Sequence, residues 1–353
     1  MYDVVIVGAG PVGCKTAELI AKRGFDVLVL EEHSEIGLPI KCSGLVSRRI
    51  FKLSRVSSDI IVNRVRKARF HIKENYIELK SKKTVYVIDR QKFDKEIAEK
   101  AEYTGAEIKD STKFGNYKKD KVLEVKTTKG SFKTKILIGA DGANSTVARV
   151  ADIKLPDNLL TGIQFTVESH FDPETVELWF GSSICPDFFG WVIPENENSA
   201  RVGLASSEKV GEHLDNFIKM RFKHEIKPKN KIVGLIRYGL IETSASDNVM
   251  LVGDAASQIK PFSGGGLIYG MIGAKIAADA CIKTLKERRY DSQFLKKNYD
   301  DVWKKKLAWP IRKGLFLKNL IHSFSDRQLS FLFSAANITK IRRLLEFTDM
   351  DLL

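Results

Sequence analysis

Short apolar runs recur along the chain, and four of them are rich in aliphatic or β-branched residues. They span residues 3–7, 26–30, 135–141 and 248–253. Apolar runs of this length are typical of strands that are buried on both faces of a parallel sheet. Between and after them the pattern is helical, over residues 89–103, 208–222 and 267–285, and again from Tyr290 onward.

The rest of the apolar pattern is strand-like. Apolar residues alternate at Val176, Leu178 and Phe180, which is typical of an antiparallel sheet with one covered face. The segments with strand character are 67–73, 76–79, 84–88, 123–127, 131–134, 162–168, 175–180, 189–193, 201–206 and 231–238.

These patterns predict an α/β protein in three parts. The first is a Rossmann-type dinucleotide-binding domain, the second an inserted antiparallel β-sheet domain that forms a lid and binds substrate, and the third a helical C-terminal region. The predicted bounds are 1–60, 85–150 and 245–290 for the first part, 61–84 and 151–244 for the second, and 291–353 for the third.

The composition limits the kind of cellular environment that we expect for the protein. The four cysteines are widely scattered, with no C-x-x-C and no zinc-type cluster, so we expect no metal site and a reduced, cytoplasmic environment. The first strand begins at residue 3, which predicts no signal peptide. Residues 266–282 are interrupted by Lys275 and Asp279, so no membrane-spanning helix is expected.

The net charge of +14 has two interpretations. One is a lysine-rich solvated surface, and the other is contact with an anionic membrane or an acidic substrate. No nucleic-acid-binding motif accompanies the charge. The helical tail places cations beside apolar stripes, so it is either an ordinary packed domain or a basic amphipathic membrane-facing surface. These cations include Lys304 to Lys306, Arg312, Lys313, Arg342 and Arg343.

The first predicted strand leads into G-x-G-x-x-G at Gly8, Gly10 and Gly13. Glycines at these positions permit the tight turn, the approach of a pyrophosphate and close packing of the following helix, whose N-terminus favours anions. The second strand ends at Glu31, followed by Glu32, where a carboxylate can accept the ribose hydroxyls. An acid there favours FAD or NAD over NADP, and the alternative is a glycine-rich turn without a ligand.

A loop with glycines at both ends, residues 37–44, follows the second strand. In a doubly wound sheet such loops lie where ligands bind, so Cys42, Ser43 and Gly44 are placed at the cofactor. The alternative for Cys42 is a small buried hydrophobic side chain. Arg90, at the start of a predicted helix, either reaches the cofactor or forms a surface ion pair.

A second loop-to-helix turn follows the strand at 248–253. Gly253 and Asp254 precede Gly264, Gly265 and Gly266, and Leu267 opens the next helix. The turn permits close approach of a flat ring, and Asp254 can accept hydrogen bonds from a sugar alcohol chain or act as a helix N-cap. Asp141, before Gly142, is a further candidate for cofactor contact.

The three elements together resemble the FAD-dependent oxidoreductases of the p-hydroxybenzoate hydroxylase superfamily, over roughly residues 1–290. This resemblance implies FAD, with Glu31 on the adenosine ribose and Asp254 on the ribityl and pyrophosphate part. Residues 39–44 (PIKCSG) match the P-x-x-C-x-G loop of geranylgeranyl reductases, and residues 189–194 (FGWVIP) with Gly203 are similar to their substrate motif. The chain departs from that motif at Phe189, Ile193 and Ala205.

The resemblance implies a reductase that saturates isolated C=C bonds of geranylgeranyl chains, with Cys42 as the candidate catalytic residue beside the flavin. The reductant is NAD(P)H or a carrier such as ferredoxin. A monooxygenase or halogenase on the same scaffold and a non-catalytic flavin electron-transfer protein are the alternatives, although the halogenase W-x-W-x-I-P motif is missing from the sequence. The candidates for the substrate wall are Phe180, Phe188, Phe189, Trp191, Pro194 and Phe262, and the alternative for those in the lid sheet is plain core packing.

Overall fold

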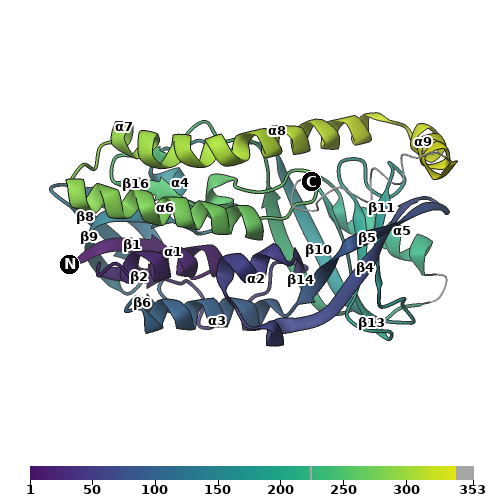
Figure 1. Ribbon diagram of the computed structural model, residues 1–353, viewed down its shortest axis with the longest axis horizontal. Coiled ribbons are helices and arrows are strands. Elements are labelled where there is room, and N and C mark those ends of the chain that lie inside the picture. Colours follow the sequence, from purple (N-terminus) through teal and green to yellow (C-terminus); the bar gives the residue numbers. More distant parts are fainter. Residues whose placement is uncertain (223–224, 339–353) are drawn as a thin grey trace.

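The computed structural model describes residues 1–222 and 225–338. Two eight-stranded sheets lie next to each other along the long axis, sheet A toward the left and sheet B toward the right of Figure 1. Helices cover sheet A, and one long helix runs past both sheets.

Sheet A has a parallel core, as the apolar runs predict. Its strand order is β15-β16-β9-β1-β2-β6, and the neighbours from β16 to β6 pair in parallel. The β7–β8 hairpin continues antiparallel from β9. The strands are β1 (Tyr2–Val7), β2 (Val27–Leu30), β6 (Glu107–Lys109), β7 (Phe114–Lys119), β8 (Leu123–Thr127), β9 (Gly130–Gly139), β15 (Ala245–Ser246) and β16 (Val249–Leu251).

Three helices pack together over sheet A: α1 (Pro11–Ala21), α3 (Arg90–Tyr103) and α6 (Leu267–Glu287), with α1 in contact with the other two. Glycine allows this closeness, because a Cβ on Gly270 of α6 would lie 2.5 Å from Val12 of α1. Helix α3 begins where expected, since the Asp89 side chain accepts a hydrogen bond from the Lys92 amide.

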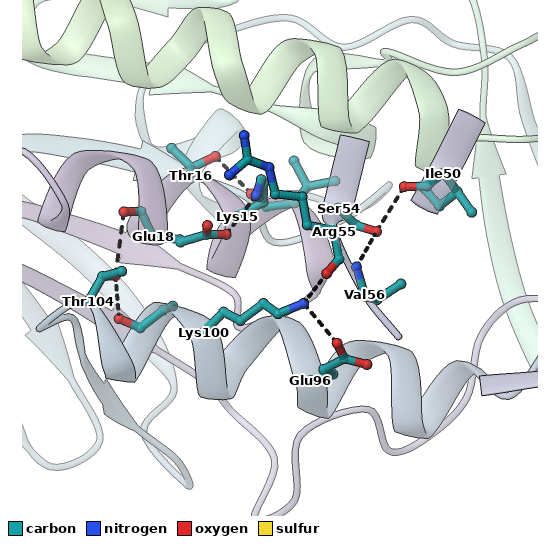
Figure 2. Close-up of polar contacts among 12 residues, drawn as sticks. Lys15, Thr16, Glu18, Ile50, Ser54, Arg55, Val56, Glu96, Lys100 and Thr104 are labelled. Carbon is teal, nitrogen blue, oxygen red and sulfur yellow. Dashed lines mark hydrogen bonds and ion pairs between the residues drawn. The ribbon is translucent and has the colours of Figure 1, made fainter. Parts of the chain in front are cut away.

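Polar contacts fasten the short helix α2 (Arg49–Ser54) and the chain after it to α3 (Figure 2). The ammonium of Lys100 on α3 donates to the Arg55 carbonyl and pairs with Glu96 at 2.8 Å. The Thr104 hydroxyl at the end of α3 donates to the Glu18 carbonyl of α1 at 3.4 Å. These bonds fix the segment that follows the Cys42 loop.

Sheet B has the strand order β14-β10-β13-β12-β11-β4-β5-β3. Its pairs are antiparallel except β11–β4, which is parallel, so the prediction of an antiparallel sheet is wrong at this pair. The chain passes through sheet A between β4 and β11, and no hairpin therefore fixes their relative direction. The strands are β3 (Leu45–Ser47), β4 (Ile61–Ile72), β5 (Asn75–Ile88), β10 (Leu159–Glu168), β11 (Thr175–Phe180), β12 (Gly190–Pro194), β13 (Ser199–Ser206) and β14 (Lys229–Arg237).

The C-terminal part is helical as far as it is described, and Arg342 and Arg343 lie outside the described residues. None of the described helices is long and apolar enough to cross a membrane. The predicted domain bounds stay a prediction. Strand β3 and the last residues of β5, 85–88, belong to sheet B although they fall within the predicted bounds of the dinucleotide-binding part. The remaining helical elements are η1 (Ser58–Ile60), α4 (Thr146–Val150), α5 (Val210–Arg221), η2 (Gly253–Ala256), α7 (Ser292–Leu295), the π-helical η3 (Lys296–Asp300), α8 (Asp301–Ser323) and α9 (Asp326–Ile338).

Candidate flavin and substrate site

The glycine turn after β1 is closely packed on one side and open on the other. Gly8 has φ +104°, and a Cβ there would lie 2.5 Å from the Ala140 carbonyl oxygen. A Cβ on Gly13 would lie 2.0 Å from the Gly8 oxygen, whereas nothing lies within 4 Å of a Cβ on Gly10. The N-terminus of α1 therefore has free space in front of it, which fits a diphosphate.

Glu31 stabilises this turn from the end of β2. Its Oε2 accepts a hydrogen bond from the Ala9 amide at 2.9 Å, and its Oε1 accepts one from the His33 amide at 3.0 Å. Glu32 points elsewhere and pairs with Lys113 at 3.0 Å, a contact that lowers the pKa of Glu32. The ribose contact of Glu31 stays a prediction.

A cavity of about 400 Å³ opens between the two sheets. Its lining joins separate parts of the chain: the first glycine turn, the Cys42 loop, the start of α3, the turn after β9, the second glycine turn and sheet B. The residues predicted as site residues that line it are Gly10, Cys42, Ser43, Arg90, Phe189, Trp191, Asp254, Phe262, Gly264, Gly265, Gly266 and Leu267. Gly8, Gly13, Gly44 and Gly253 instead shape the turns beside it.

Cys42 faces Arg90 across one wall of the cavity. The Arg90 guanidinium interacts with the Cys42 sulfur and pairs with Asp94 one helical turn away, at 3.0 Å between Nη2 and Oδ1. Burial raises the pKa of Asp94, and the charge of Arg90 opposes that rise. Arg90 thus forms a largely buried ion pair with Asp94 in the cavity wall, and its contact with the cofactor stays a prediction.

Sheet B holds the Cys42 loop in place. The Arg201 Nη1 donates to the Ser43 carbonyl at 2.6 Å and to the Ile88 carbonyl at 3.0 Å. Glycine is required at position 44, because its φ is +70° and a Cβ on Gly44 would lie 2.7 Å from Nη1 of Arg201. Sequence reasoning missed Arg201, although a lone arginine inside the apolar β13 was a visible signal.

The second glycine turn brings Asp254 into the cavity. Burial raises the pKa of Asp254, and Arg90 opposes the rise. A Cβ on Gly266 would lie 2.3 Å from Asp254 Oδ1, so the carboxylate lies against the start of α6. That helix has no side-chain N-cap bond, which argues against the N-cap interpretation of Asp254.

The carboxylate of Asp141 is used within its own loop. Its oxygens accept hydrogen bonds from the Ser145 hydroxyl at 2.6 Å and from the Thr146 and Val147 amides at 2.7 and 3.0 Å. It therefore stabilises the start of α4, while its neighbours Ala140 and Gly142 line the cavity. A direct cofactor contact by this carboxylate stays a prediction.

Sheet B supplies an apolar wall. The Trp191 Nε1 donates to Gln164 Oε1 at 2.9 Å, and its ring lies over Gly203, where a Cβ would be 2.6 Å away. Phe188, a further candidate for the substrate wall, lines the cavity and stacks on Phe189 with centroids 4.2 Å apart. Leu178 and Phe262 complete this apolar wall.

Two predicted substrate residues lie behind this wall. Phe180 does not line the cavity, and its ring packs against Phe189 at 5.2 Å and Phe262 at 6.4 Å. Pro194 is also absent from the lining, and its carbonyl accepts a hydrogen bond from the Asn63 side chain at 2.9 Å. Both support the wall from outside the cavity.

The sequence profile described as "FAD binding domain" matches residues 1–297. Together with the open space at Gly10 and the Asp254 turn, this match defines the protein as an FAD-dependent flavoprotein, which confirms the predicted cofactor and fold class. A geranylgeranyl bacteriochlorophyll reductase-like protein from Thermoplasma acidophilum superposes with a TM-score of 0.85 at 27% identity, over 94% of this chain and 90% of that one.

Two curated relatives define the family more narrowly. The chain is 30% identical to the digeranylgeranylglycerophospholipid reductase of Methanosarcina acetivorans, over 94% of this chain and 88% of that protein. It is 31% identical to digeranylgeranylglycerophospholipid reductase 2 of Methanococcoides burtonii, over 100% and 90%. The chain therefore belongs to the family of these reductases. A p-nitrophenol 4-monooxygenase from Pseudomonas putida, with a TM-score of 0.77 at 18% identity, shares the fold alone.

Proposed function

We propose that the protein is an FAD-dependent reductase that saturates isolated C=C bonds of geranylgeranyl chains on archaeal-type ether lipids or their precursors. The observation that carries the proposal is that Cys42, the second glycine turn and the aromatic wall line the same cavity. An apolar chain fits this wall, and the family relationship supports the same class of substrate.

The turn from Gly8 to Gly13, Glu31, Asp254 and the turn from Gly264 to Gly266 would hold FAD. When bound and reduced, FAD supplies a hydride for one carbon of the double bond. The side chains of sheet B orient the alkene and keep water out. Because an unpolarised alkene develops positive charge as it is protonated, the aromatic faces of Phe189 and Trp191 also stabilise the reacting chain.

Cys42 is our candidate for the proton that the other alkene carbon receives. Its Sγ lies in the cavity wall and accepts a hydrogen bond from the Gly44 amide at 3.4 Å. Arg90 stays charged beside the sulfur, so a thiolate left after proton transfer would be stabilised until solvent returns the proton.

We further propose that electrons arrive from a transient donor, either NAD(P)H or a small carrier such as ferredoxin. The lipid substrate places the enzyme at the inner face of the cell membrane as a peripheral, cytoplasmic protein. The +14 balance suits an anionic lipid surface.

Mass spectrometry tests the reaction. Chemically reduced holoprotein is mixed with a detergent-dispersed digeranylgeranyl lipid, and we expect products heavier by successive steps of two hydrogens. Oxygen-dependent NAD(P)H consumption with an aromatic substrate, without lipid product, would identify a monooxygenase instead. A coloured protein that is reduced and reoxidised without any lipid product would point to electron transfer.

A further inference from the structure

Helix α8 has an inner face that is part of the cavity's support. A Cβ on Gly314 would lie 3.0 Å from Pro261, next to Phe262 in the cavity lining. The Lys318 ammonium donates to the Asp187 carbonyl and lies 5.9 Å from the centre of the Phe188 ring. The inner residues recur every three or four positions and are buried: Trp303, Leu307, Ile311, Gly314 and Lys318.

The outer face of the same helix carries an exposed apolar stripe. Trp309 is 74% exposed and Phe316 is 65% exposed, and Val302 and Leu320 extend the row at 39% and 40%. Residues seven apart lie only about 20° apart around a helix, so Val302, Trp309 and Phe316 form one line. Large exposed aromatic side chains in a row are unusual on a protein that has no partner there.

Cations flank this stripe on both sides. At roughly 100° per residue, Lys305 and Arg312 lie within about 60° of it on one side, and Lys306 and Lys313 on the other. All four are exposed, and none has an ion-pair partner in the described part of the chain. No acidic residue occurs between residues 302 and 325.

A second helix with exposed apolar side chains lies beyond the end of α8. Figure 1 shows α8 along one edge of the molecule, running past both sheets, with α9 beyond its end. Helix α9 adds Phe331, which is 73% exposed, and Leu332, which is 44% exposed.

We propose that this stripe, defined by Val302, Trp309, Phe316 and Leu320 with its four flanking cations, docks the protein on an anionic lipid bilayer. The apolar side chains enter the interfacial region and the cations meet the phosphates, as in helices that lie in the plane of a membrane. This deepens the peripheral contact proposed above, and it holds whether or not a prenyl chain is reduced.

Charge complementarity selects a bilayer over a second copy of the chain. In a two-fold symmetric pair the same patch faces itself. Lys305, Lys306, Arg312 and Lys313 would then oppose like charges, and the stretch from residue 302 to 325 supplies no acidic side chain to pair with them, which is unfavourable. A phosphate-rich surface neutralises all four cations together.

Sedimentation of the flavin-loaded protein with phosphatidylglycerol vesicles tests the proposal. Replacement of the four cations by Glu should weaken partitioning by about a thousandfold, because each basic residue near the surface contributes about 1 kcal/mol. The matched control reverses four exposed cations on the β7–β9 strands and their connections: Lys118, Lys121, Lys126 and Lys133. Equal loss in both variants would mean that total charge, not α8, binds the vesicle, and would overturn the proposal.

The apolar stripe has its own test. Trp309→Ser with Phe316→Ser should lower partitioning, whereas Tyr103→Ser, at a residue that is 93% exposed elsewhere, should not. In wild type, brominated lipid should quench Trp309 emission, a signal that Trp309→Phe removes. Vesicle binding that is unchanged in the stripe variants would overturn the proposal. A wild-type dimer that the stripe variants dissociate would also overturn it, because the stripe would then be an interface between two copies of the chain.

Activity separates this proposal from the proposed function. The α8 variants should reduce detergent-dispersed lipid at the wild-type rate and vesicle-embedded lipid more slowly. A protein that binds vesicles through α8 but reduces no lipid in detergent would refute the reductase and leave the docking surface standing.

Discussion

Arg201 and Ser43 are joined across the two halves of the site. The guanidinium of Arg201, on β13 of sheet B, donates to the Ser43 carbonyl at 2.6 Å, directly after Cys42 in the chain. The same group pairs with Glu195 at 2.8 Å, which fixes its orientation. Sheet B therefore sets the position of the loop that carries the candidate catalytic thiol.

We expect Arg201→Met to lower the free energy of unfolding by about 3 kcal/mol, because two carbonyls lose a charged donor. Alkene reduction should fall by about tenfold to a hundredfold, since small displacements of reacting groups are costly. Urea unfolding and single-turnover kinetics measure the two effects. Arg201→Lys keeps the positive charge but loses the planar guanidinium that reaches two carbonyls at once. Compared with Arg201→Met, it should therefore restore the free energy of unfolding more than the reduction rate. Equal restoration of both would show that Arg201 does not position the loop.

Cys42→Ala should slow alkene reduction by about a hundredfold, the scale of a lost proton donor. Flavin content should not change, because the thiol is one of many cavity-lining groups. Cys281→Ala, at a buried cysteine in α6 far from the cavity lining, serves as the control. Wild-type turnover in Cys42→Ala would remove the catalytic assignment.

Gly162 sets the width of the cavity beside Trp191. A Cβ there would meet its nearest neighbours at 3.7–3.8 Å, so Gly162→Ala should be tolerated, whereas Gly162→Leu extends into the cavity. In Gly162→Leu we expect the efficiency of reduction of a geranylgeranyl lipid, divided by that of a shorter prenyl lipid, to fall at least about tenfold from the wild-type ratio. Gly211→Leu, on the exposed side of α5, is the matched control. Equal losses for both chain lengths would contradict a role in length selection.

His71 should make stability depend on pH. Burial lowers its pKa from the ordinary 6.5 to about 4, and its ring stacks on Trp179 at 4.0 Å. Between these values the unfolded chain binds a proton that the folded chain does not, so stability should fall as pH drops from 6.5 toward 4.

Thermal melts across this pH window measure the effect. His71→Phe should make the slope shallower without abolishing it, because burial also lowers the pKa of His322 to about 4. The exposed His170→Gln should leave the slope unchanged. An unchanged slope in His71→Phe would assign the acid sensitivity to other groups.

The sequence predicted the parts of the fold that are local. The central strands of sheet A, β1, β2, the end of β9 and β16, are continuous apolar runs, and Asp89 marks the start of α3 with its own side chain. The resemblance to a known family added the cofactor, and the Cys42 loop and Asp254 turn meet in one cavity as expected.

The rest depends on contacts between distant segments. The parallel β11–β4 pair and the link from Arg201 to Ser43 join residues more than a hundred positions apart, which no local pattern encodes. Phe180 and Phe189 have the same chemistry, so only packing decides that Phe189 lines the cavity and Phe180 supports it from behind.

The short strand β3 pairs with β5, so the chain after Cys42 continues into sheet B although it begins at the edge of sheet A. Gly234 of β14 also lies under this loop, where a Cβ would be 2.8 Å from the Lys41 oxygen. A chimera that exchanges the substrate sheet with that of a relative should therefore transfer residues 37–47 with it. A chimera boundary placed at residue 60 would separate the Cys42 loop from the strands of sheet B that contact it.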